Sequence, residues 1–151
     1  MTNWIQVEPK IVEIVRDLPP KGSFMIQREF PGCQLMFSRI DNDGHTTLRT
    51  EVCNNDPEEN ERISSRGWEL KDPFGGVWRR EVPWPTDEKI LKQQVAEGTH
   101  ILRNVWREVT LNGFQYLAWI DTPPPPGWMF WKSKKDKEIE YPDLGLPKMK
   151  S

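Results

Sequence analysis

Residues 23–53, SFMIQREFPGCQLMFSRIDNDGHTTLRTEVC, contain three runs in which apolar and polar side chains alternate. Alternation with a period of two is typical of a strand that buries one face. Pro31-Gly32 and the segment Asp41–Gly44 separate the runs, and both are typical turn sequences. Because such short turns join antiparallel neighbours, the stretch predicts an antiparallel meander. We expect its strands at residues 23–30, 33–40 and 45–53.

Amphipathic helices are predicted on either side of this meander. Apolar residues recur at helical spacing from Val7 to Leu18, and the prolines that follow end the segment. A second stripe steps by four and three residues through Leu91, Val95, Gly98, Leu102, Val105 and Val109. A glycine inside a helix costs about 1 kcal/mol relative to alanine. We therefore expect Gly98 to lie where the helix backbone approaches the sheet closely.

A short helix and two further strands are predicted between the meander and the second long helix. Asp56-Pro57 is a typical helix start, and Gly67 is a typical helix end. Strands are expected at residues 68–70 and 77–82. The sequence therefore predicts an α+β fold in the order α-β-β-β-α-β-β-α. Its five-stranded antiparallel sheet is expected to be covered on one face by the two long helices.

The C-terminal part differs in composition from the rest of the chain. We expect residues 1–122 to form a single α+β domain, in which 114–120 is a last strand or an extended arm. Residues 123–151 are expected to form a polyproline spacer and an extended tail rich in aromatic residues and lysine, disordered over 141–151. The aromatic segment Trp128–Trp131 has three interpretations: it packs back on the domain, binds a partner protein, or contacts an anionic membrane surface.

The composition argues against several classes of protein. The chain has 151 residues, including eight Trp and fourteen Pro, and a formal net charge of −2. No apolar run approaches the roughly 20 residues of a transmembrane helix, and no signal peptide is visible. We therefore expect a cytoplasmic protein without stable membrane insertion. Two cysteines make no disulfide framework, and the slightly acidic balance argues against nucleic acid as a partner.

The sequence offers no recognisable catalytic, cofactor or metal site. Cys33, Cys53, His45 and His100 lack the paired spacing of zinc ligands, and Asp41–Gly44 has its glycine at the wrong position for a calcium loop. No phosphate-binding glycine motif is present, and no nucleophile motif lies beside a histidine. We therefore expect no catalytic residue, no cofactor, no metal and no enzymatic activity.

The candidate binding residues are tryptophans, their arginine neighbours and the aromatic segment of the tail. Exposed Trp and Arg side chains carry much of the binding energy at protein interfaces. We expect the sheet face opposite the helices to bind a partner together with these residues. They are Trp78, Arg79, Arg80, Trp84, Trp128, Met129, Phe130 and Trp131. The alternative for Trp78, as for Trp68, is a place in the core.

Several short features lie at successive points along these elements. They are Glu51-Val52 followed by Asn54-Asn55, Gly67-Trp68 before Pro73, Trp78, Pro83 and Pro85, and the segment Leu102–Val109. In these features and in the order of elements, residues 7–109 resemble the TY-Chap family. Its domains have a type III secretion chaperone-like fold and are related to the YbjN-like peptide-binding group. The resemblance implies the same order of elements, no enzymatic activity, and binding to another protein or peptide, often as a homodimer.

The function expected from these observations is a non-catalytic, chaperone-like module that binds another protein or peptide. Three alternatives stay open. An immunity or inhibitor protein would block one toxin or enzyme, with its acidic charge steering it to a basic target. A small enzyme would need a deep pocket containing His45 or His100. A nucleic-acid-binding protein would need Arg79, Arg80, Arg103 and Arg107 on one face.

Overall fold

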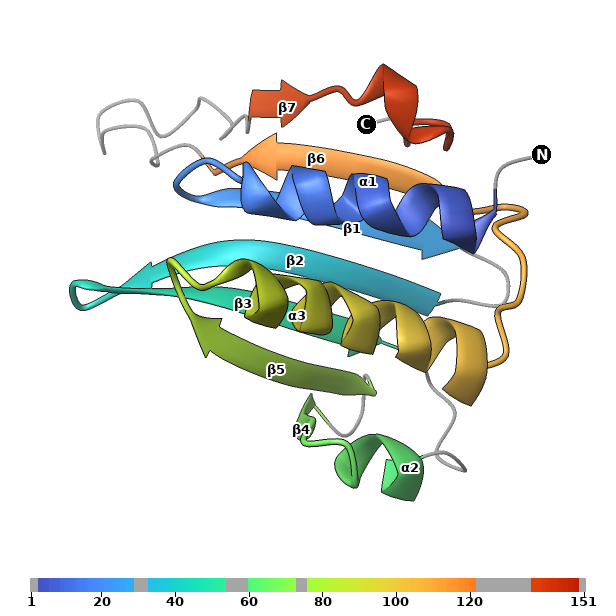
Figure 1. Cartoon of the computed structure of the whole chain (residues 1–151), viewed down its shortest axis with the longest axis horizontal. Helices are drawn as coiled ribbons and strands as arrows, with labels where there is room; N and C mark the ends of the chain where they lie inside the picture. The colour runs from blue at the N-terminus through green and yellow to red at the C-terminus, as the bar shows by residue number, and fades with distance from the viewer. Residues whose placement is uncertain (1–2, 29–32, 54–59, 73–75, 122–136, 150–151) are drawn as a thin grey trace, which may run out of the picture.

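One antiparallel sheet lies at the centre of the protein (Figure 1). The computed structural model describes residues 3–28, 33–53, 60–72, 76–121 and 137–149. Within these residues the sheet has seven strands, in the order β4-β5-β3-β2-β1-β6-β7. Their bounds are Gly22–Arg28 (β1), Cys33–Asn42 (β2), His45–Cys53 (β3), Glu69–Asp72 (β4), Val77–Pro83 (β5), Gln115–Ile120 (β6) and Lys137–Ile139 (β7).

The predicted meander is confirmed. β1 pairs with β2, and β2 pairs with β3, each time antiparallel. The register places Leu35 between Ile26 and Val52, and all three side chains are fully buried. Because side chains alternate along a strand, the same register puts their sequence neighbours on the opposite face of the sheet.

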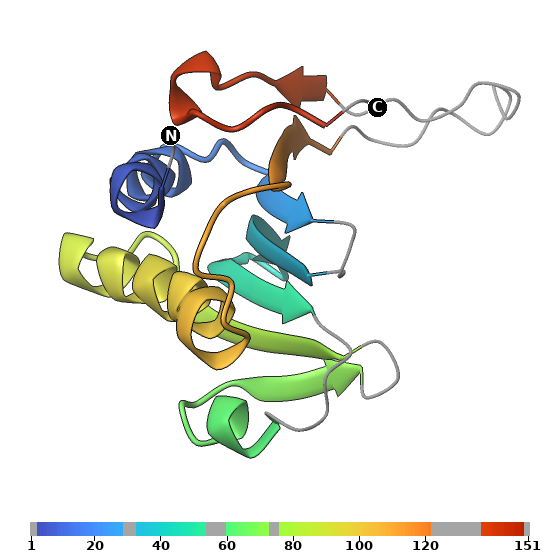
Figure 2. The same ribbon diagram turned by 90° about the vertical axis from the view of Figure 1, so that its right-hand side faces the viewer.

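The expected helix layer is also confirmed. α1 (Trp4–Arg16) and α3 (Glu88–His100) lie on the same face of the sheet, as Figure 2 shows edge-on. Asn3 and Gln6 form a capping box at the start of α1, and the Asp87 side chain accepts from the Ile90 N–H at the start of α3. The short α2 (Asn60–Ser64) buries Ile63 in the same core. None of the helices in the described part of the chain is long and apolar enough to cross a membrane.

The second long helix ends earlier than its apolar stripe predicts. A π-helical turn, Ile101–Val105, follows α3, and the chain then bends at Arg107, which has a φ of 59°. Val109 was expected to continue the buried stripe, but its side chain is 74% exposed. The spacing of the apolar residues does not reveal that the α-helix gives way to a π-helical turn before Val109.

The expectation of five strands is wrong, because β6 and β7 extend the sheet beyond β1. For residues 114–120 the sequence allows either a last strand or an extended arm, and the structure has the strand β6 there. The side chains of Tyr116 and Ala118 face the helices and are buried. The expected disorder from residue 141 onward is also wrong for residues 141–149. Leu144 and Leu146 are buried there, although prolines and a glycine leave this stretch without regular periodicity. Long-range contacts order it.

Candidate functional site

The sheet has two unlike faces. α1 and α3 cover one of them, and we call the opposite one the distal face (Figure 2). The strand register assigns side chains to it, because positions directly opposite each other on paired strands share a face. Its central residues are Ser23, Met25, Met36, Ser38, Ile40, Arg49, Glu51, Arg79, Glu81, Leu117 and Trp119.

One half of the distal face is apolar. A cross-strand row runs from Leu117 through Met25 to Met36, and Trp119 lies opposite Ser23 in the next row. Met36, Leu117 and Trp119 are half-buried, while Met25 in the middle of the row is buried. The Ser23 hydroxyl is hydrogen-bonded to that of Ser38 at 2.9 Å. Because each hydroxyl has a partner, this half presents methionine, leucine and indole side chains with few unmet polar groups.

The other half of the distal face is charged but internally paired. Arg79 lies directly opposite Glu51, with Arg79 Nη2 3.1 Å from Glu51 Oε2. Arg49 lies opposite Glu81 in the next row, with 3.7 Å between Arg49 Nε and Glu81 Oε2. Opposite charges on facing strand positions stabilise the pairing modestly. The charges cancel, so this half forms a polar margin beside the apolar half.

Trp78 and Arg80 do not belong to the distal face. Trp78 lies opposite Val52 on the helix side and is 5% exposed, so the core interpretation holds for it. Arg80 shares that side, where its Nη1 donates to the Arg66 carbonyl at 2.9 Å and its Nε donates to Gln94 Oε1 at 3.3 Å. Since alternate strand positions face opposite ways, Arg79 projects from the distal face while its two sequence neighbours do not.

Trp84 also lies on the helix side, half-buried against the core. The guanidinium of Arg39 lies 5.4 Å from the centre of its ring, and Arg39 in turn donates to the Leu18 carbonyl at 3.1 Å. The expectation that Trp78 and Trp84 join the distal face is therefore wrong in its geometry. The other candidates, Trp128, Met129, Phe130 and Trp131, lie outside the described residues.

The residues that do form the apolar half were missed by the sequence reasoning. A signal was available, because Met25 and Met36 occupy the strand positions that alternate with the buried Phe24, Ile26 and Phe37. Polar residues are usual at such positions when the second face is in water. Apolar residues at both the inward-facing and the outward-facing positions of neighbouring strands indicate that the second face of the sheet is apolar too.

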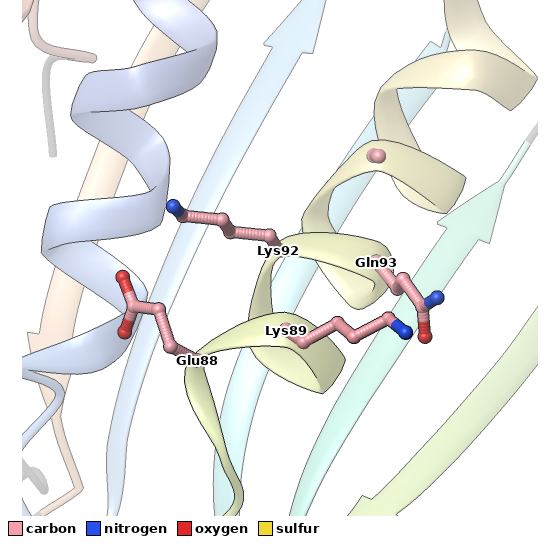
Figure 3. Close-up of a pocket in the computed structure, with 5 residues that line it drawn as sticks. Glu88, Lys89, Lys92 and Gln93 are labelled. Atoms are coloured by element: carbon pink, nitrogen blue, oxygen red, sulfur yellow. The ribbon is translucent and has the colours of Figure 1, made fainter.

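The helix side of the described residues has several shallow hollows. Figure 3 shows one of them, lined by Glu88, Lys89, Lys92, Gln93 and Ala96 of α3, with Glu88 and Lys92 pointing towards α1. Arg16 of α1 forms an ion pair with Glu88, and both side chains are nearly half exposed. Neither histidine nor cysteine lines this hollow.

The histidines and cysteines do not form a cluster of three or more possible metal ligands among the described residues. The His100 ring pairs with Asn104 at 2.9 Å, and burial together with the charge of Arg66 lowers the pKa of His100. Burial raises the pKa of the Cys33 thiol to about 11, which disfavours the reactive thiolate. Among the described residues, no three or more His, Cys, Asp or Glu side chains are grouped so that they could hold a metal ion.

The arginines proposed for a nucleic-acid surface are likewise not on one face. Arg79 belongs to the distal face and Arg80 to the helix side, so the four-arginine set is divided by the sheet itself. The geometry instead groups apolar side chains, on the half of the distal face formed by β1, β2 and β6.

The chain is thus an α+β protein with a largely self-paired charged surface on β3 and β5 and an apolar surface beside it. Comparison with protein-family models, curated proteins and solved structures gives no match. The resemblance to the TY-Chap family therefore stays a prediction.

Proposed function

We propose that this protein is a non-catalytic, chaperone-like module that binds a segment of another protein on the apolar half of its distal face. The observation that carries the proposal is the row Leu117–Met25–Met36, which continues across three strands on the face away from α1 and α3. Trp119 extends this apolar surface along β6 into the next cross-strand row. Together these side chains form a continuous apolar strip flanked by paired charges.

The chemistry of the strip suits partner segments of varied sequence. Methionine side chains are flexible and polarizable, so they adapt to apolar groups of different shape. Further burial of a half-buried apolar side chain such as Met36 or Leu117 contributes about 1 kcal/mol. Binding then depends on apolar burial, as expected for a module that holds an exposed segment of its partner.

The paired charges next to the strip favour specificity over raw affinity. The Glu51–Arg79 pair borders Met36 directly, because Glu51 lies opposite Met36 in the register. A partner that places a lone charge beside this pair has to disturb it, while an apolar or neutral polar group does not. The preferred partner is therefore a protein or peptide segment with apolar side chains and little charge.

Display of random peptides on phage tests this proposal with defined probes. Peptides are selected on the full-length wild type, and their affinities are then measured for Met36→Lys and for Gln93→Lys. Both variants add one positive charge, but Gln93 is exposed on α3, on the other side of the sheet. Both variants must first melt within a few degrees of the wild type.

We expect the selected peptides to be rich in apolar residues and to bind Met36→Lys at least tenfold more weakly, which corresponds to about 1.4 kcal/mol. Their affinity for Gln93→Lys should match that of the wild type. Peptides that bind all three proteins equally would place the binding surface elsewhere and overturn the proposal. A library that yields no binder at micromolar affinity would argue against a peptide-binding function.

A further inference from the structure

The chain makes a tight turn at Asn112-Gly113, between the π-helical turn and β6. Figure 1 shows this connection in orange between α3 and β6. The Phe114 N–H donates to the Leu111 carbonyl at 3.1 Å, which closes the turn. Both turn residues are exposed, while Leu111 and Phe114 on either side of them are buried. The turn is therefore a solvent-exposed bend between two anchored side chains.

Gly113 cannot be replaced without strain. Its φ is 83°, in the left-handed region that favours glycine. A Cβ atom at this position would come within 3.3 Å of Arg28 Cδ and 3.4 Å of Arg28 Cγ. The turn thus packs on the aliphatic part of the Arg28 side chain, and a larger residue at position 113 meets both obstacles. The fold itself requires that a glycine follow Asn112.

A glycine in this position makes the preceding asparagine chemically labile. Asparagine is one of the thermolabile residues of proteins, because the main-chain nitrogen of the next residue can attack its side-chain amide carbon. A side chain on that next residue hinders the attack, and glycine has none. Asn112 is the one asparagine of the sequence that precedes a glycine. The residue that the turn geometry requires is therefore also the one that best permits this reaction.

The two reacting groups are not held in hydrogen bonds. Within the part of the chain that the structure describes, neither the Asn112 amide nor the Gly113 N–H has a hydrogen-bond partner. Asn104 is also exposed, but its Nδ2 lies 2.9 Å from the His100 ring nitrogen, and the next residue, Val105, is β-branched and buried in the π-helical turn. Because an exposed turn opens more readily than a packed helical segment, Asn104 is a matched comparison within the same chain.

We propose that Asn112 is a site of spontaneous deamidation in the folded protein, and that the isoaspartate formed there loosens the packing of Phe114. The Gly113 nitrogen bonds to Asn112 Cγ and gives its proton to hydroxide, while the side-chain nitrogen takes a proton from water and leaves as ammonia. Water then opens the succinimide ring at either carbonyl. In sum, one amide and one water give one carboxyl group and one ammonia. The turn lies outside the apolar strip, so the proposal goes beyond the function proposed above.

The effect on Phe114 follows from the path of the main chain in isoaspartate. When the ring opens at the main-chain carbonyl, the backbone passes through the former side chain and gains one CH₂ group, so the bond from Phe114 to Leu111 no longer closes the same turn. Phe114 is 1% exposed and packs edge-on against Trp4, with 5.9 Å between ring centres. Arg28, which lies under the turn, also lies over this ring and pairs with Glu108. A longer backbone therefore disturbs a closely packed corner of the core.

Incubation of the folded, full-length protein at mildly alkaline pH, followed by peptide mass spectrometry, tests the proposal. The gain in mass when NH₂ is replaced by OH is followed at Asn112 and Asn104 in the same sample, and chromatography separates isoaspartyl from aspartyl peptides. Asn112→Gln keeps an amide in the turn, but its longer side chain must close a larger ring and reacts far more slowly. Asn112→Asp, measured fresh, adds the negative charge without the longer backbone.

We expect Asn112 to deamidate at least tenfold faster than Asn104, which corresponds to about 1.4 kcal/mol in activation free energy. Once most chains carry isoaspartate, the melting temperature of the wild type should be about 3 °C or more below that of fresh protein. Asn112→Gln incubated in the same way and fresh Asn112→Asp should both melt like the fresh wild type. A rate at Asn112 no higher than at Asn104 overturns the site. Isoaspartate without a loss of melting temperature, or an equal loss in Asn112→Gln, overturns the effect on Phe114.

Discussion

Gly98 of α3 lies directly against Leu35 of β2. A Cβ atom at Gly98 would come within 2.6 Å of Leu35 Cδ1 and 3.4 Å of Phe37 Cζ. Leu35 and Phe37 are both fully buried, so neither has free space into which it can shift. The glycine therefore lets the helix backbone approach the sheet, as its place in the apolar stripe predicts.

Gly98→Ala should destabilise the protein in spite of the better helix propensity of alanine. The added methyl overpacks the core at a cost of about 1–3 kcal/mol, and the propensity gain of about 1 kcal/mol does not offset the upper part of that range. Urea unfolding monitored by circular dichroism measures the change. Gln93→Ala, at an exposed position of the same helix, is the control and should change stability by less than about 0.5 kcal/mol. A Gly98→Ala variant more stable than the wild type would contradict the close approach.

The parts of the fold that could be predicted from the sequence are those with a regular apolar pattern. The meander and the two long helices have strong periodicity, and their burial follows from it. The pairing of β6 with β1 depends on a contact across about ninety residues, and nothing local in the sequence specifies it. Leu144 and Leu146 of the C-terminal segment 137–149 are separated by a glycine and become ordered only because tertiary contacts bury them.

Trp78 and Trp84 were expected on the sheet face opposite the helices, but both lie on the helix side. Trp78 is a large aromatic residue beside two arginines, but its strand position faces the helices and its side chain is buried. Met25 and Met36 occupy the alternate strand positions, which face away from the helices and where polar residues are more usual. Whether a strand position coincides or alternates with the buried positions therefore predicts which face its side chain occupies better than the residue type does.

Cys33 should react slowly with thiol reagents in the folded protein. Burial raises the pKa of its thiol to about 11, with a smaller contribution from the charge of Glu108. At pH 8 its thiolate fraction is then about two orders of magnitude below that of a free cysteine. Iodoacetamide labelling followed by peptide mass spectrometry measures both cysteines in one sample. The half-buried Cys53 serves as the internal comparison and should be labelled first. Labelling of Cys33 at the rate of the urea-unfolded chain would contradict its buried position.

Glu97 should stabilise the protein at neutral pH and lose this effect in acid. Burial alone would raise the pKa of its carboxyl, but hydrogen bonds and charge from Arg66, with Trp68 and Arg80, outweigh burial and lower it. Arg66 donates from Nε and Nη2 to the two carboxylate oxygens at 3.0 and 2.7 Å. The folded protein thus binds this proton less tightly than the unfolded chain. The contribution is present above the unfolded pKa and is lost as the pH falls through the folded pKa.

Glu97→Gln should therefore be less stable than the wild type by about 1–2 kcal/mol at pH 7, and the difference should shrink towards pH 3. Urea unfolding at several pH values measures this. Glu88→Gln is the matched control, because the Arg16–Glu88 pair is nearly half exposed and should contribute little to stability. A Glu97→Gln effect that is the same at pH 7 and pH 3 would show that the carboxylate charge is not its source.

Arg28 and Glu108 form an ion pair whose side chains are only 16% and 12% exposed. Arg28 also lies 5.3 Å from the ring centre of Phe114, and the Glu108 carbonyl accepts from the Trp4 indole N–H at 2.7 Å. The pair therefore joins the end of β1 to the chain that leaves the π-helical turn. Removing one partner leaves the other charge buried and unpaired, which is costly.

Arg28→Met and Glu108→Leu should each destabilise the protein by about 3 kcal/mol, and the double variant should cost clearly less than their sum. The reason is that the double variant leaves no buried charge without a partner. Chemical unfolding of the wild type and three variants gives the coupling energy, and the exposed pair Arg16→Met and Glu88→Leu provides the control cycle. Additive effects in the Arg28–Glu108 cycle would mean that the two charges do not depend on each other and would contradict a buried pair.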